Sequence, residues 1–132
     1  MPRLTAKRIR GNFGEEAAAK HLKKSGYRIL ERNFSALGCE IDLIVQNREF
    51  IVFVEVKSRR LLPQAETVFT KPASAVDREK QKHLILAAKA YLAYHPSVGR
   101  KCRFDVVEVY LDPASLEDRL LSVHHIQGAF TA

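Results

Sequence analysis

Two apolar segments close together in the chain, residues 40–46 and 50–58, constrain the fold more than any other feature. They read Glu-Ile-Asp-Leu-Ile-Val-Gln and Phe-Ile-Val-Phe-Val-Glu-Val-Lys-Ser, and only the polar residues 47–49 separate them. Such a density of β-branched and aromatic residues is typical of strands. Two such runs joined by a short polar turn predict a β-hairpin.

The two faces of this hairpin can be read from the residue numbers, because side chains alternate between the faces of a strand. If residues 48–49 form a two-residue turn, residues whose numbers sum to 97 lie opposite each other. Asp42 then faces Glu55, and Glu40 faces Lys57 on the same side of the sheet. A three-residue turn would break this arrangement.

One side of the hairpin is entirely apolar and must be core. The other side is apolar near the turn, so its charged residues lie in a pocket of a sheet that is covered on both sides. The core side consists of Ile41, Leu43, Val45, Val52, Val54 and Val56. Carboxylates directly opposite each other destabilise a strand pair, and burial adds a further cost for each unpaired charge. A hard divalent cation bound by Asp42 and Glu55 would remove this repulsion, and the waters that it retains suit phosphodiester hydrolysis. The alternative is a solvated strand end with ordinary salt bridges.

The remaining segments predict one α/β domain. In chain order, the predicted elements are a helix at 12–25, strands at 27–34, 40–46 and 50–58, a helix at 77–94, and strands at 103–110 and 120–126. Asn12 is a suitable cap for the first helix, and Ser25-Gly26 is a suitable stop. We therefore expect a basic mobile arm at residues 1–10, followed by a single domain at 11–132 with a mixed sheet flanked by helices.

Three further polar residues lie at predicted inward positions. Glu15 lies on the inward face of the first helix, so it either reaches the hairpin carboxylates or forms a capping box with Asn12. Gln81 faces inward on the second helix and either orients a water or phosphate oxygen, or is a hydrogen-bonded amide at the edge of the core. Asp105 lies within an apolar strand, and we interpret it as structural.

The charge balance favours polyanionic partners. The chain has 22 Lys+Arg against 15 Asp+Glu, a formal net charge of +7, which is typical of proteins that contact nucleic acid. The cations suited to phosphate contacts near the second helix are Lys71, Arg78, Lys80 and Lys82. Two cysteines are too few for a disulfide scaffold, and no apolar stretch approaches the roughly 18 residues of a membrane span. We expect a cytoplasmic protein without membrane association.

Five motifs together resemble the YraN-like family of bacterial proteins. They are Gly14-Glu15, Glu40-Ile41-Asp42-Leu43-Ile44, Phe53-Val54-Glu55-Val56-Lys57, Lys80-Gln81 and Phe104-Asp105-Val106-Val107. This family is regarded as a distant relative of archaeal Holliday junction resolvases, within the restriction-endonuclease-like superfamily of PD-(D/E)xK nucleases. The resemblance runs over nearly the whole chain. It departs at Cys39, where the family usually has the second of two glycines.

The resemblance implies an αβββαβ core and a Mg²⁺- or Mn²⁺-dependent nuclease. Asp42, Glu55 and the backbone carbonyl of Val56 would ligate the metal. Lys57 would orient the attacking water and stabilise charge on the phosphate, and Glu15 would match the acidic helix residue of the resolvases. Because those relatives act as dimers on branched DNA, the resemblance also implies a homodimer and makes branched DNA a candidate substrate.

Glu40 and Gln81 belong to the same motifs, and we regard them as accessory residues of the site. Two alternative functions stay open. The first alternative is a nucleic-acid-binding module that keeps the nuclease fold without activity. The second is a nuclease that cleaves RNA. Retention of the repelling carboxylates argues against a pure binding module.

Overall fold

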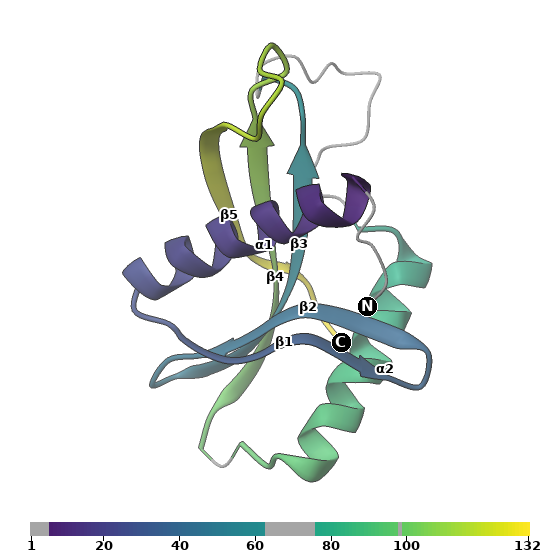
Figure 1. Ribbon diagram of the computed structural model, residues 1–132. Helices are drawn as coiled ribbons and strands as arrows, with labels where there is room; N and C mark the ends of the chain where they lie inside the picture. Colours follow the sequence, from purple (N-terminus) through teal and green to yellow (C-terminus); the bar gives the residue numbers. More distant parts are fainter. Residues whose placement is uncertain (1–5, 63–75, 98) are drawn as a thin grey trace, which may run out of the picture.

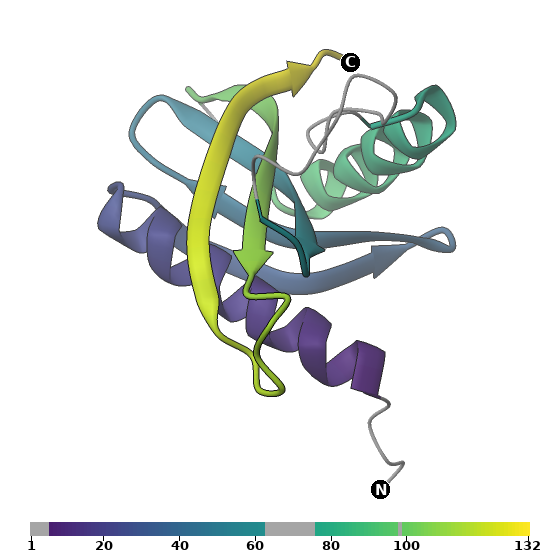
Figure 2. The same ribbon diagram turned by 90° about the horizontal axis from the view of Figure 1, so that it is seen from above.

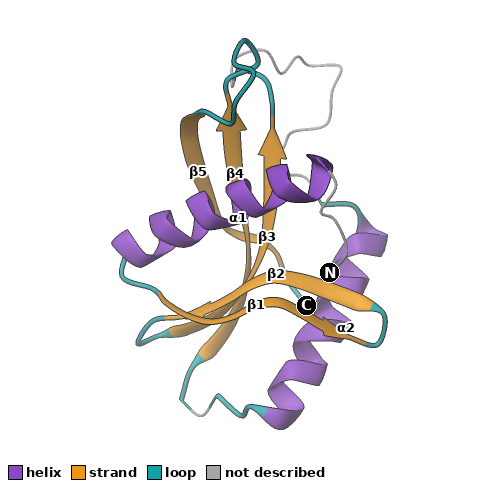
Figure 3. Ribbon diagram, viewed as in Figure 1, coloured by secondary structure: helices purple, strands orange, loops and turns teal. Residues whose placement is uncertain are grey.

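The computed structural model describes residues 6–62, 76–97 and 99–132, and for residues 6–11 it describes the backbone alone. Within these ranges the chain forms two helices and five strands (Figure 3). They are α1 (Ala6–Lys24), β1 (Arg28–Ala36), β2 (Cys39–Gln46), β3 (Phe50–Arg59), α2 (Arg78–Tyr94), β4 (Lys101–Leu111) and β5 (Leu120–Phe130). The order is the predicted one.

The five strands form one mixed sheet in the order β1-β2-β3-β4-β5. β3 and β4 are parallel, and the other three neighbouring pairs are antiparallel. Parallel neighbours require a crossover connection, and α2 lies in the connection between them (Figure 1). The predicted α/β architecture is therefore confirmed, and it is consistent with a restriction-endonuclease-like core.

The two helices cover opposite faces of the sheet (Figure 2). On the α1 face, Ala18, Ala19 and Leu22 pack on Leu43, Val45, Val52, Val54, Val107, Val109 and Leu111. On the α2 face, Leu84, Ala87, Ala88 and Tyr91 pack on Ile44, Ile51, Phe53 and Phe104. Neither described helix is both long enough and apolar enough to cross a membrane.

The first helix begins earlier than the sequence indicates. α1 starts at Ala6, so residues 6–10 of the expected arm are helical, whereas residues 1–5 lie outside the described residues; the division into arm and domain stays a prediction. The segment Ala-Lys-Arg-Ile-Arg contains good helix formers and no breaker, which explains the extension. The predicted stop is confirmed: Gly26 has φ of 93°, and the Tyr27 N–H donates to the Leu22 carbonyl at 3.0 Å.

The hairpin of β2 and β3 has the predicted register. The Asn47 N–H donates to the Phe50 carbonyl at 3.0 Å across a two-residue turn. The paired residues are Gln46 with Ile51, Val45 with Val52, Ile44 with Phe53 and Leu43 with Val54. Pairing ends there, because β2 continues along β1 whereas β3 continues along β4 (Figure 1). The two strands therefore form a fork that begins at the position of Asp42 and Glu55.

The divergence of β2 also changes the predicted faces. Ile41 was expected beside Leu43 on the α1 side, but it is buried in the α2 cluster, as is Cys39. Strict alternation describes a regular strand, and β2 turns away from β3 after Leu43, where their pairing ends. This turn moves the neighbouring acidic residue Glu40 away from its predicted partner on β3.

Candidate active site

Asp42 lies at the base of the fork, where the backbone ladder between β2 and β3 has ended. Its Oδ2 accepts a hydrogen bond from the Val56 N–H at 2.7 Å. The carboxylate thus takes the place of a strand carbonyl for this N–H, which fixes the side chain beside β3. Burial raises the pKa of Asp42, and the charge of Glu40 adds to this effect, although the Val56 N–H opposes it.

Glu55 is the neighbouring carboxylate on β3, and its side chain is only 15% exposed. Burial, followed by the negative charge of Asp42, raises the pKa of Glu55 to about 7. Lys80 and Lys57 act in the opposite direction without outweighing these effects. The Lys80 Nζ lies 3.9 Å from the Glu55 Oε1, at the long end of an ion pair, and its side chain is 44% exposed. Asp42 and Glu55 therefore lie together as the register predicts, and their charges are incompletely compensated.

The chemistry of this pair fits a hard divalent cation. Two carboxylates that resist simultaneous ionisation are stabilised when a positive ion lies between them. Across the described ranges, no three His, Cys, Asp or Glu side chains converge as a metal-binding group, so the carboxylate donors here are a pair. Mg²⁺ commonly uses one or two carboxylates and retains water at its other positions. The Val56 carbonyl stays a predicted third ligand.

Lys57 follows Glu55 on the same side of β3 and is partly buried. Burial, followed by the charge of Arg59, lowers the pKa of the Lys57 ammonium. Its register partner on β4 is Glu108, which is 9% exposed and accepts a hydrogen bond from the Tyr110 hydroxyl at 2.9 Å. We did not predict Glu108 from the sequence, because its proximity to Lys57 depends on the parallel pairing of β3 with β4.

The predicted pairing of Glu40 with Lys57 is wrong, because the strands have separated before these residues. Glu40 instead lies beside Asn33 of β1. With its Nδ2 facing the carboxylates, Asn33 donates to the Glu40 Oε1 at 3.2 Å and to the Glu15 Oε2 of α1 at 3.1 Å. Glu15 and Glu40 are thus brought together by a residue that the sequence interpretation missed.

The position of Glu15 depends on a close approach between α1 and β3. A Cβ added at Gly14 would lie only 1.8 Å from the Ser58 Oγ, so glycine is the residue that allows this contact. Asn12 lies inside α1, which begins at Ala6, so the alternative of a capping box with Glu15 is wrong. α1 therefore presents a partly buried carboxylate toward Asn33.

The N-terminal end of α2 contributes Lys80 and Gln81. Asp77 caps this helix by accepting from the Lys80 N–H at 2.8 Å. The Gln81 Nε2 donates to the Val76 carbonyl at 2.7 Å, which corresponds to the predicted alternative of a hydrogen-bonded amide. Capping thus fixes the helix end from which the Lys80 side chain reaches Glu55.

The predicted basic group is only partly assembled on α2. Arg78 and Lys82 are exposed, as phosphate contacts require, whereas Lys80 is engaged with Glu55. Lys71 lies outside the described residues. The role of these cations in binding phosphate stays a prediction.

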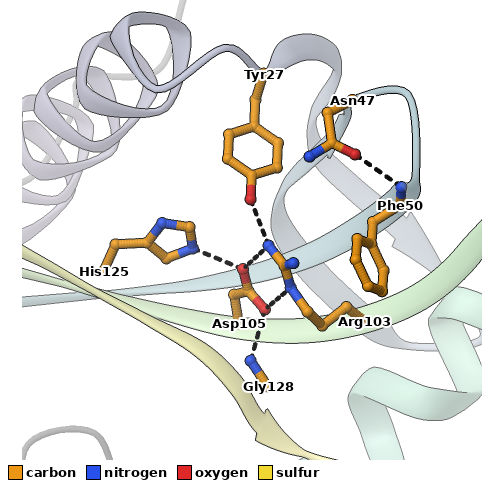
Figure 4. Close-up of polar contacts among 7 residues, drawn as sticks. All are labelled: Tyr27, Asn47, Phe50, Arg103, Asp105, His125 and Gly128. Atoms are coloured by element: carbon orange, nitrogen blue, oxygen red, sulfur yellow. Dashed lines mark hydrogen bonds and ion pairs between the residues drawn. The ribbon is translucent and has the colours of Figure 1, made fainter.

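Asp105 forms a separate polar network at a different position in the sheet (Figure 4). Arg103 binds it with two hydrogen bonds, from Nε to Oδ1 at 2.8 Å and from a terminal nitrogen to Oδ2 at 2.9 Å. His125 Nε2 lies 2.6 Å from Oδ2, and the Gly128 N–H donates to Oδ1 at 3.0 Å. Tyr27 completes the network through its hydroxyl, which bonds to Arg103. These contacts join β4, β5 and the connection between α1 and β1, as expected of a structural residue.

Comparison with known proteins agrees with the resemblance seen in the motifs. The sequence profile described as "Uncharacterised protein family UPF0102" matches residues 14–109. A UPF0102 protein of Caldanaerobacter subterraneus is 43% identical over 98% of this chain and 100% of its own length. Relatives from Moorella thermoacetica and Symbiobacterium thermophilum are 44% and 45% identical, covering 94% and 92% of this chain and 97% and 96% of their own lengths. The chain therefore belongs to the UPF0102, or YraN-like, family.

Proposed function

We propose that this protein is a metal-dependent nuclease that hydrolyses phosphodiester bonds in DNA. The observation that carries the proposal is the pair Asp42 and Glu55 at the fork between β2 and β3. Both carboxylates have a raised pKa, and Lys57 lies two residues after Glu55 on the same strand. Two partly buried acids with incomplete charge compensation destabilise a fold. A bound cation would relieve this repulsion, which is why such a pair favours a cation-binding function.

The residues of the fork have separable roles in this proposal. A bound Mg²⁺ or Mn²⁺ would polarise the phosphate and make a water more acidic. Asp42, held by the Val56 N–H, and Glu55 would hold the cation in place. The Lys57 ammonium would orient the attacking water and stabilise the negative charge that develops on the phosphate oxygens.

The net charge of +7 supports a polyanionic substrate. DNA is the substrate that the family resemblance favours, with branched DNA and a homodimer as its more specific implications. A nuclease that prefers RNA and an inactive nucleic-acid-binding module are the competing functions, and the same assay separates all three.

The experiment is a cleavage assay with Mn²⁺ on branched, flapped, single-stranded and duplex DNA and on matched RNA. Asp42→Asn and Glu55→Gln keep the size of each side chain while removing its charge. Glu49→Gln is the matched control, because Glu49 is an exposed carboxylate that pairs loosely with Lys101 at 3.9 Å. We expect cleavage by the wild type and the control, and loss of cleavage in both site variants.

Cleavage that persists in both site variants, or in excess chelator, would contradict the proposed mechanism. Binding of nucleic acid without cleavage and without Mn²⁺ uptake would favour the binding module. Faster cleavage of RNA than of the matched DNA would assign the RNA-directed alternative.

A further inference from the structure

Asn33 adopts a backbone conformation that is unusual for a residue inside a strand. Its φ is 52°, although its neighbours Arg32 and Phe34 pair regularly with Leu43 and Ile41 of β2. The register places Asn33 opposite Asp42, and this position is skipped in the series of paired residues. A left-handed conformation is unfavourable for a non-glycine residue, and asparagine tolerates it better than most. Such local strain is found preferentially at functional sites.

The side chain of Asn33 makes contacts that match this conformation. The amide is assigned with Nδ2 toward the carboxylates, because carboxylate oxygens can only accept; in this orientation Nδ2, which has two hydrogens, lies 3.2 Å from the Glu40 Oε1 and 3.1 Å from the Glu15 Oε2. One amide group therefore bridges a carboxylate from β2 and a carboxylate from α1. A common donor lowers the cost of holding two like charges close together.

The bridged carboxylates lie beside the fork. Glu40 precedes Asp42 by two residues on β2, and the register of β1 with β2 places Asn33 opposite Asp42. Glu15 is held near Glu40 by the same amide and by the close packing of Gly14 on Ser58. Four carboxylates therefore lie in two groups, with the Asp42–Glu55 pair inside the fork and the Glu15–Glu40 pair beside it.

We propose that Asn33 is a positioning residue that holds Glu15 and Glu40 beside the fork, where they accept hydrogen bonds from the hydration waters of a divalent cation. This inference rests on the proposed function, because it assumes a cation at Asp42 and Glu55. Partners that orient a metal site through hydrogen bonds typically change metal affinity by about 10–100-fold when they are removed.

Two substitutions separate the amide from the backbone conformation. Asn33→Gly keeps the positive φ and removes the amide, and Asn33→Asp keeps the shape but replaces the donor with a third carboxylate. Leu37→Gly is the matched control, because Leu37 has φ of 55° and is 71% exposed. We expect Asn33→Gly to weaken Mn²⁺ binding by about 10-fold in calorimetry and Leu37→Gly to leave it unchanged, whereas Asn33→Asp should bind Mn²⁺ more tightly than Asn33→Gly because its added negative charge attracts the cation.

Mn²⁺ affinity that is unchanged in Asn33→Gly and Asn33→Asp would overturn the positioning role, while leaving the proposed nuclease intact. The bridge is tested separately in the metal-free protein by the NMR signals of the Asn33 side-chain amide. Those signals should move in both Glu15→Ala and Glu40→Ala, and signals that stay in place would overturn the bridge. If the Asn33 amide signals move in both variants but the wild type takes up no Mn²⁺, the bridge exists without a cation site. The proposed function then fails, and the positioning role of Asn33 fails with it.

Discussion

Two buried carboxylate sites in this sheet show opposite chemistry. Asp105 is fully buried, yet hydrogen bonds from His125, Arg103 and the Gly128 N–H overcome the effect of burial and hold its pKa below the usual value. Glu55 is less buried, but burial and the charge of Asp42 raise its pKa to about 7. The more deeply buried acid is therefore the more easily ionised one.

The difference lies in the partners and not in the depth of burial. Around Asp105 the fold supplies donors to both oxygens, including a bidentate guanidinium, so the charge is stabilised where it lies. Around Glu55, Lys80 lies at 3.9 Å and Lys57 also acts on the carboxylate, but the negative charge of Asp42 repels that of Glu55. A complete network is typical of a structural role, whereas the incomplete network around Glu55 is consistent with the proposed cation site.

The largest effect that this comparison predicts is on Asp105. Asp105→Asn should lower the free energy of unfolding by about 3–5 kcal/mol, because it removes the charge that Arg103 and His125 surround. Glu16→Gln is the control, because it breaks the exposed ion pair of Glu16 with Arg32 and should cost at most about 1 kcal/mol. Urea unfolding at neutral pH measures both. A loss below about 1 kcal/mol for Asp105→Asn would contradict the structural assignment.

The comparison also predicts opposite pH dependence. Because the pKa of Asp105 is lowered, its contribution to stability is complete above its ordinary value of 3.8 and is lost as the pH falls below it. Because the pKa of Glu55 is raised from 4.5 to about 7, the unfolded chain ionises first as the pH rises through this window. The metal-free protein should therefore lose stability between these two values, by about 3 kcal/mol when the shift is converted.

Glu55→Gln tests that second effect. In excess chelator, this variant should be more stable than the wild type near neutral pH and nearly equal to it at about pH 4.5, because the penalty of ionising Glu55 is removed. Urea unfolding across this pH window measures the difference. If the two proteins lose stability in parallel as the pH rises, the carboxylate of Glu55 is not the strained group.

The local part of the site could be predicted from the sequence. Side-chain alternation and the two-residue turn determine the register of the hairpin, and that register brings Asp42 to Glu55. The order of helices and strands could also be predicted, because the apolar periodicity of each element lies within its own segment of the sequence. The interpretation of Asp105 as structural likewise followed from its apolar neighbours.

The rest of the site depends on how segments that are distant in the sequence pack against each other. No local sequence pattern predicts these contacts. The fork after Leu43 separates Glu40 from Lys57 and turns Ile41 toward α2, so simple alternation fails there. Asn33 was missed because a positive φ inside a strand has only a weak signal, namely an asparagine among strand residues. We predicted that Lys80 contacts phosphate. Its contact with Glu55 was missed because it depends on how α2 packs on the sheet.

The central claim is that Asp42 and Glu55 form a divalent cation site, and Mn²⁺ titration of the metal-free protein tests it most directly. The wild type and Glu49→Gln should bind Mn²⁺ in calorimetry, with a stabilisation of about 2.7 kcal/mol at about 100-fold the dissociation constant. Asp42→Asn and Glu55→Gln should lose both the heat of binding and the stabilisation. Equal Mn²⁺ binding by all four proteins, or no binding by the wild type at millimolar Mn²⁺, would contradict the claim.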